Sequence, residues 1–105
     1  LPLACEEVFG PVVLVETFSD MDDAVRKAND SAYGLQAGVF TDSAAARHVA
    51  VQGLEVGGII LDDVPTFRAD TMPYGGVKAS GLGREGVRYA MEDYCERRTV
   101  VAWNG

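Results

Sequence analysis

A chain of 105 residues has room for a single domain with one modest core. Its hydrophobic content of 48% and charged content of 24% are typical of a soluble globular protein and exclude general disorder. A net charge of −7, no basic run longer than Arg97-Arg98, and no apolar stretch near the roughly 18 residues of a membrane span argue against nucleic acid and membranes as partners.

The first predicted elements are a strand and a helix. Residues 12–18 form a β-branched run that predicts a strand with a buried face. Ser19 or Asp20 is a suitable N-cap for a helix that continues to about Ser31, with one apolar stripe. Tyr33 and Gly34 then predict a turn.

A second strand, helix and strand follow. Residues 37–41 predict a short strand, and Asp42 or Ser43 can cap a helix that ends near Leu54. Residues 59–61 predict a third strand that is apolar throughout. Strands that alternate with helices of about 10–13 residues indicate crossover units, so we expect an α/β fold with a mostly parallel, Rossmann-like sheet.

The remaining third of the chain begins with an irregular segment, residues 62–83. Loops of this length are uncommon in compact domains and are often functional, although a packed surface connector is the alternative interpretation. Residues 84–96 then predict a third helix, and residues 98–103 (RTVVAW) predict a final strand.

Residues 81–86 match the pattern GxGxxG. In a dinucleotide-binding fingerprint this pattern joins an apolar strand to a helix, and its amides face a pyrophosphate. No apolar strand precedes Gly81, and the chain ends before a βαβ unit is completed. We therefore favour a helix start shaped by glycine, with Ser80 near it.

Candidate nucleophiles and bases are few. Cys5 and Cys95 have no metal-ligand spacing, and nothing in the sequence brings His48 towards either thiol. We expect structural or incidental cysteines, reduced in a cytoplasmic setting. The start at Leu1, without an initiator Met, suggests a piece of a longer protein.

The acidic turn in residues 6–11 (EEVFGP) is the more informative feature. Adjacent carboxylates on a strand point to opposite faces, so Glu6 with Glu7, or Asp62 with Asp63, is not arranged for acid–base catalysis. A single carboxylate on a rigid turn can accept hydrogen bonds from a ribose diol. A solvated acidic turn is the alternative.

Four segments together resemble the aldehyde dehydrogenase superfamily, in order and over essentially the whole chain. The resemblance implies oxidation of an aldehyde to an acid with NAD or NADP, through a cysteine nucleophile and a glutamate that activates water. Both groups lie upstream of the EExFGP segment and have no counterpart here, so we expect the chain to be inactive alone. The matching segments are residues 6–13 (EEVFGPVV), 28–41 (ANDSAYGLQAGVFT), 65–86 (PTFRADTMPYGGVKASGLGREG) and 98–103 (RTVVAW).

The resemblance also implies site residues. Glu7 is expected to hydrogen-bond the nicotinamide ribose, and Phe9 to pack beside the nicotinamide. Thr66 and Phe67, with Arg68 as a further candidate, are expected near the substrate at the mouth of the aldehyde tunnel. The PTFR form of this loop is similar to that of members acting on small or functionalised aldehydes.

The resemblance divides the chain into residues 1–97, the later part of the catalytic domain, and residues 98–105. In the second part, Thr99 to Trp103 would form a strand that joins a homo-oligomer. One departure is Asp62-Asp63, where the family's third strand often ends in Asn. Two alternatives are a ligand-binding module that holds a phosphorylated ligand on residues 75–86, and an assembly module without catalysis.

Overall fold

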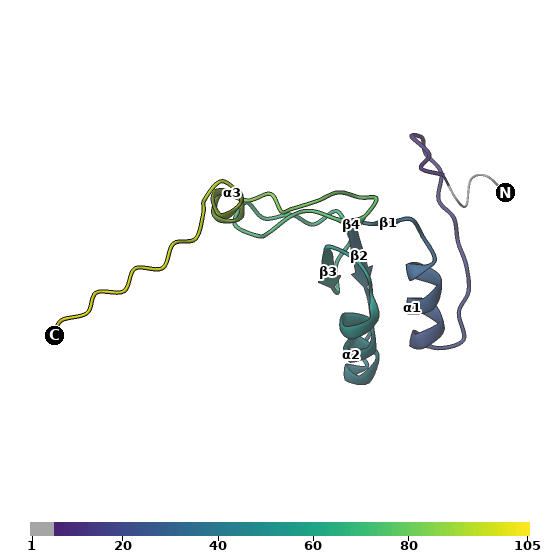
Figure 1. Ribbon diagram of the computed structural model, residues 1–105. Coiled ribbons are helices and arrows are strands. Elements are labelled where there is room, and N and C mark those ends of the chain that lie inside the picture. Colours follow the sequence, from purple (N-terminus) through teal and green to yellow (C-terminus); the bar gives the residue numbers. More distant parts are fainter. Residues whose placement is uncertain (1–5) are drawn as a thin grey trace.

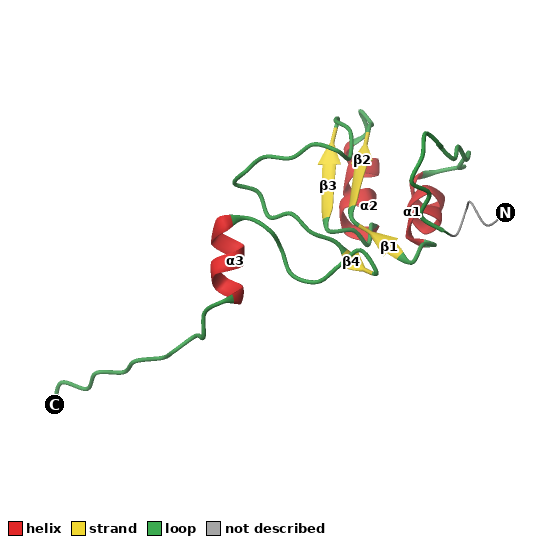
Figure 2. Cartoon of the chain, turned by 90° about the horizontal axis from the view of Figure 1, so that it is seen from above, coloured by secondary structure: helices red, strands yellow, loops and turns green. Residues whose placement is uncertain are grey.

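A computed structural model describes residues 6–105. These described residues form three helices and four short strands, joined by long connections (Figures 1 and 2). In chain order they are α1 (Met21–Asn29), β1 (Tyr33–Gly34), β2 (Gln36–Val39), α2 (Ala44–Gly53), β3 (Gly58–Leu61), β4 (Val77–Lys78) and α3 (Val87–Asp93).

The strands β2 and β3 pair in parallel, with Gln36 opposite Gly58 and Val39 opposite Leu61. Helix α2 is the crossover between them and covers one face of the pair (Figure 2). Helix α1 packs against α2, where Gly53 lies so close to Val25 that a Cβ would come within 2.8 Å of Cγ1. This β–α–β unit confirms the predicted α/β fold.

Of the three predicted helix starts, the first two are correct, and the structure selects one cap at each. The side chain of Asp20 accepts a 2.9 Å hydrogen bond from the amide of Asp23. The Ser43 hydroxyl accepts a 3.2 Å bond from the amide of Ala46. Each bond satisfies one of the amide groups that a first helical turn leaves unpaired.

Two predicted strands are wrong. Residues 12–18 and 98–103 belong to no strand, and their apolar side chains are largely solvent-exposed: Val15 is 87% exposed and Trp103 is 90% exposed. The local sequence favours an extended chain in both segments, but a strand also needs a partner for its backbone groups. No strand of residues 6–105 lies beside either segment.

The predicted irregular segment is more ordered than expected. β4 lies within it and pairs antiparallel with β1. Tyr74 and Glu85 form an isolated antiparallel bridge. Helix α3 runs from Val87 to Asp93, inside the predicted range of 84–96. It starts later than predicted because Gly86 adopts a φ of 114° directly before it.

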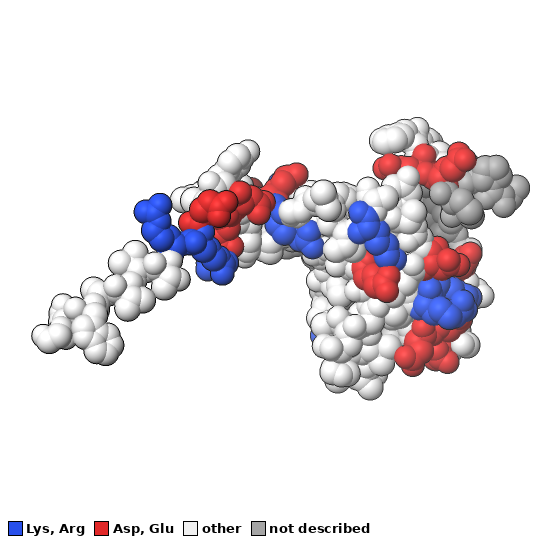
Figure 3. Space-filling model, in the orientation of Figure 1, with Lys and Arg blue, Asp and Glu red and all other residues white. Residues whose placement is uncertain are grey.

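The core of the described residues is thin. Only Val39 and Ala50 are buried apolar side chains in this part of the chain. The radius of gyration is 18.2 Å, whereas a compact domain of this length has about 13 Å. Residues 94–105 leave the body as an extended arm, and beyond its basic start the arm carries no charge on the face seen in Figure 3. The apolar surfaces of the arm and of residues 12–18 are therefore uncovered.

Candidate functional site

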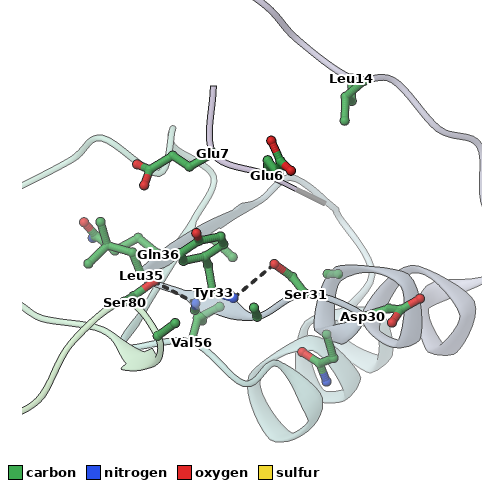
Figure 4. A pocket seen from close by; sticks show the side chains of 16 residues that line it. Glu6, Glu7, Leu14, Asp30, Ser31, Tyr33, Leu35, Gln36, Val56 and Ser80 are labelled. Atoms are coloured by element: carbon green, nitrogen blue, oxygen red, sulfur yellow. Dashed lines mark hydrogen bonds between the residues drawn. The ribbon is translucent and has the colours of Figure 1, made fainter. Parts of the chain in front are cut away.

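A cleft of about 940 Å³ lies between the C-terminal end of α1, the strands β1 and β2, and the turn after β4. Its lining runs along residues 28–37 and includes Val56, Ala79 and Ser80. The N-terminal segment closes another side through Glu6, Glu7 and Leu14 (Figure 4). A volume of this size falls within the range of small-molecule sites.

The charged side chains that line the cleft, within the described part of the chain, are all acidic. They are Glu6, Glu7 and Asp30, and no Lys or Arg lies among them. An acidic lining attracts cationic ligands and hydrogen-bond donors, and it repels phosphate groups. The cleft therefore suits an uncharged or cationic ligand that carries hydroxyl groups.

Tight turns follow Glu7 along the chain. The amide of Gly10 donates to the carbonyl of Val8 at 3.1 Å, and the amide of Val12 donates to the carbonyl of Gly10 at 2.8 Å. These consecutive three-residue turns give the segment its defined path. Glu7 lines the cleft, but Phe9 does not and is 93% exposed. The structure thus places one of the two predicted cofactor-binding residues in the cleft.

The floor of the cleft is a close contact between β1 and the turn after β4. The amide of Gly34 donates a 2.9 Å hydrogen bond to the hydroxyl of Ser80. Gly34 is buried, and a Cβ there would lie 2.8 Å from Cγ2 of Val77 and would overlap the carbonyl of Glu55. Ser80 therefore belongs to the cleft and not, as its position suggested, to the start of α3.

The predicted substrate loop is tied to the cleft but does not line it. The Gln36 amide group, which lines the cleft, donates a 3.3 Å hydrogen bond to the carbonyl of Phe67. The loop also approaches β2 at Gly38, where a Cβ would come within 2.6 Å of the carbonyl of Asp63. Thr66 and Phe67 are both exposed.

Arg68 has defined partners within the chain. Its guanidinium bonds a carboxylate oxygen of Glu85 at 2.6 Å and lies 4.2 Å from the centroid of the Tyr74 ring. The backbones of Tyr74 and Glu85 also exchange two hydrogen bonds. Arg68 therefore clamps the loop around Phe67 to the PYGG and GRE segments, a contact that the sequence patterns did not reveal.

Asp62 directly follows the third strand, at the place where the family resemblance led us to expect Asn. Its φ is 61°, a left-handed conformation that Asp and Asn tolerate better than most residues. Its carboxylate accepts a 2.6 Å bond from Arg47, which also donates to the carbonyl of Thr41 at 2.9 Å. This ion pair with Arg47 of α2 thus holds Asp62, the first residue of the predicted irregular segment, against the helix.

The glycine-rich motif shapes the backbone. Gly81, Gly83 and Gly86 have φ values of 136°, 69° and 114°, which side chains rarely adopt. The strand before them, β4, has only two residues and ends at Lys78, and Leu82 between Gly81 and Gly83 is fully exposed. This geometry fits the predicted helix start and not a dinucleotide fingerprint.

In residues 6–105, the one described cysteine and the histidine belong to different elements. Cys95 is an exposed free thiol after α3, whereas His48 is exposed on α2 in another part of the molecule (Figure 1). Cys5 lies outside the described residues. Residues 6–105 contain no group of three metal-ligating side chains. Their helices also lack the length and apolar character that crossing a membrane requires.

Comparisons with known proteins all point to the same family. The sequence model of the aldehyde dehydrogenase family matches residues 1–100. The lactaldehyde dehydrogenase of Methanococcus maripaludis is 51% identical over 98 residues, which are 93% of this chain and 21% of that relative. The chain therefore spans only a minor part of the curated relatives that it matches.

Solved structures agree with the sequence comparison. Aldehyde dehydrogenase 21 from Physcomitrella patens, in complex with the reaction product succinate, matches with a TM-score of 0.81 and 52% identity, over 85% of this chain and 18% of that chain. The glyceraldehyde-3-phosphate dehydrogenase GapN from Methanocaldococcus jannaschii, complexed with NADP, matches with a TM-score of 0.64 and 48% identity, over 66% of this chain and 15% of that chain.

Proposed function

The chain belongs to the aldehyde dehydrogenase family, and from this we propose that it forms the C-terminal part of the catalytic domain of an enzyme that oxidises an aldehyde to a carboxylic acid with NAD or NADP. We name that full-length enzyme the parent enzyme. The observation that carries the proposal is the acidic cleft, because Glu7 of the family motif lines it together with the YGLQ segment of the same family pattern.

The cleft fits the nicotinamide and ribose end of such a cofactor. The Glu7 carboxylate accepts hydrogen bonds, as a ribose diol requires, and Phe9 offers an exposed ring for the nicotinamide. An acidic lining suits the cationic ring of the oxidised cofactor and disfavours its phosphates. When bound, the cofactor accepts a hydride from the substrate. Its phosphates would then lie beyond this cleft.

The groups that perform covalent chemistry come, in this proposal, from parts of the parent enzyme outside these residues. Cys95 does not line the cleft, and no described side chain is placed there as a base for a thiol. The contribution of this chain is then binding and positioning: Glu7 for the cofactor and the loop around Phe67 for the aldehyde. The isolated chain should not oxidise aldehydes.

We propose a small 2-hydroxyaldehyde of the lactaldehyde class as the substrate. The name of the Methanococcus relative supports this choice. Thr66 and Phe67 supply a hydroxyl and an aromatic ring on an exposed loop, which fits a short substrate with one polar group. The Gln36 bond to Phe67 connects this loop to the cofactor cleft.

We further propose that residues 98–105 are an assembly segment and that Thr99 to Trp103 pair with another subunit of a homo-oligomer. Support comes from their extended, uncovered state: Val100 and Val101 are 81% and 80% exposed. Unpaired apolar segments of this kind recruit other chains. The exposed Cys95 thiol is compatible with a reducing, cytoplasmic setting.

The test compares the parent enzyme with the isolated chain. The parent enzyme should form NADH or NADPH from lactaldehyde, and the 105-residue chain should form neither above a matched blank. Loss of nucleophile and base typically lowers catalysis by about 10³-fold or more, so the contrast should be large. A parent enzyme inactive with every aldehyde, or an active isolated chain, would contradict the proposal.

A further inference from the structure

Lys78 lies behind the cleft and has acceptors on three sides. Its ammonium group donates to the carbonyl oxygens of Asn29 at 2.8 Å and Ser31 at 3.2 Å. It also lies 2.8 Å from a carboxylate oxygen of Glu55. The side chain is 25% exposed and does not itself line the cleft. An ammonium group has three donor hydrogens, so these contacts can use all of them.

Lys78 contacts, or lies next to, three separate walls of the cleft. Residues 28–31 form the wall at the end of α1, and Val56, next to Glu55, forms a second. The residues directly after Lys78, Ala79 and Ser80, form a third. One side chain therefore joins three walls without entering the space between them.

The end of α1 needs such a partner. The last carbonyl groups of a helix have no partner within it, and they carry the negative end of the helix dipole. Lys78 satisfies one of them and neutralises this end. Asn29 adds a second tie, because its side chain donates to the carbonyl of Gly53 at 2.7 Å and accepts from the amide of Glu55 at 2.9 Å.

The backbone of Lys78 is strained to keep this position. Its φ is 54°, a left-handed conformation that is uncommon for a residue with a long side chain. Such a conformation persists where the surroundings fix it, and it often marks a ligand site. Here the pairing of Lys78 with Tyr33 and the 2.9 Å bond from the amide of Ala79 to the carbonyl of Ala32 hold it.

We propose that Lys78 is a positioning residue of the cleft: its ammonium group sets the distance between the end of α1, the Glu55–Val56 turn and the turn at Ala79 and Ser80, and through that distance sets cofactor affinity. This inference rests on the proposed function, because it takes the ligand of the cleft to be the nicotinamide cofactor. The physical link between Lys78 and the walls does not depend on that assignment.

The test uses the parent enzyme with Lys78→Met, which keeps an unbranched side chain, one heavy atom shorter, and removes the ammonium group. Binding of NADH or NADPH, whichever the wild type prefers, is followed by fluorescence titration. The dissociation constant should rise roughly tenfold, as expected when charge-assisted hydrogen bonds are lost. Lys27→Met is the matched control, because Lys27 donates to the carbonyl of Thr17 and pairs with Asp23 but touches no cleft wall. It should bind like the wild type.

Hydrogen exchange separates this inference from the proposed function. In Lys78→Met, amide exchange should accelerate at residues 32–35 and 79–80, and in Lys27→Met it should not. If the wild type binds no nicotinamide cofactor, the proposed function fails, and the exchange result alone then decides whether Lys78 holds the walls.

Two results would overturn the inference. One is a Lys78→Met enzyme that binds cofactor as the wild type does, even if it melts at a lower temperature. The other is an equal loss of affinity in the Lys27→Met control. If Lys78→Met does not fold, Glu55→Gln replaces it: this variant keeps the carbonyl contacts of Lys78 and should raise the dissociation constant by about threefold. Unchanged affinity in Glu55→Gln would then count against the inference.

Discussion

The side-chain amide of Gln36 donates a 3.3 Å hydrogen bond to the carbonyl oxygen of Phe67. Gln36 lines the cleft, and Phe67 lies on the loop assigned to the substrate, so this bond connects the two proposed sites. In the parent enzyme, Gln36→Met should raise the KM for the aldehyde by a few-fold, since such a bond is worth about 0.5–1.5 kcal/mol net.

The control for this prediction is Gln52→Met, on the exposed surface of α2. Steady-state kinetics with the aldehyde as the varied substrate give the comparison. If the two variants have the same aldehyde KM, the bond does not position the loop.

Glu7→Gln keeps the shape of the side chain and replaces a charged acceptor with a neutral amide. In the parent enzyme this change should cost about 1.5–3 kcal/mol in cofactor binding or hydride transfer. Glu16→Gln is the control, because Glu16 lies on the same N-terminal segment but does not line the cleft. Cofactor titrations and steady-state kinetics measure the effect. If both variants match the wild type, Glu7 is a solvated turn residue without a role in cofactor binding.

Arg68→Met should destabilise the parent enzyme. The change removes the 2.6 Å pair with Glu85 and the contact with the Tyr74 ring. Each is worth up to about 1 kcal/mol at an exposed site, so the combined loss of unfolding free energy should be up to about 2 kcal/mol. Arg88→Met, whose side chain is 82% exposed and 3.7 Å from Glu92, should change it little. If Arg68→Met and the wild type have the same denaturation midpoint, Arg68 does not hold these segments together.

The start of α1 should weaken in acid. The side chain of Arg26, aided by the backbone amide of Ser19 and by Lys27, lowers the pKa of Asp23 below its ordinary value of 3.8. Ionised Asp23 therefore favours the folded state above pH 3.8, and this contribution is lost as the pH falls through the lowered pKa.

Circular dichroism of the chain between neutral pH and strong acid measures this effect. The difference in helicity between the wild type and Asp23→Asn should shrink as the pH falls below 3.8. Asp22→Asn is the control, because within residues 6–105 the side-chain bonds of this turn involve Asp20 and Asp23 and not Asp22. A difference between wild type and Asp23→Asn that is constant with pH would refute the assignment.

The isolated chain should self-associate through its C-terminal arm. Sedimentation of the chain with and without residues 98–105, over a range of concentrations, tests this. Truncation should reduce association, since the arm carries exposed Val100, Val101 and Trp103. Undiminished association would instead identify other uncovered apolar surfaces, such as residues 12–18. A monomeric intact chain would exclude both sources.

Elements fixed by nearby residues were predictable. The caps Asp20 and Ser43 and the strands β2 and β3 follow from short patterns, because a cap needs only a partner three residues away. Residues 12–18 and 98–103 have the same local preference for extended chain but failed as strands. A strand forms only where its backbone groups hydrogen-bond to a neighbouring strand, and residues 6–105 provide no such partner for these two segments.

The site was predictable only where a family pattern covered it. Glu7 was found through the EExFGP segment, and the structure places it in the cleft. No role in the cleft was predicted for Ser80, Gln36 or Lys78, because their roles depend on contacts between distant residues. Ser80 bonds a glycine 46 positions away, and Lys78 bonds a carbonyl 49 positions away. No periodicity in the sequence records such pairs.

The thin core has a thermodynamic consequence. In the described residues, Val39 and Ala50 are the only buried apolar side chains, so burial within this chain supplies little of the free energy that ordering the backbone requires. The rest of this free energy could come from the exposed apolar surfaces, if another polypeptide segment covers them. Folding is then linked to binding by mass action, and a melting temperature measured for this chain would rise with the concentration of the covering segment.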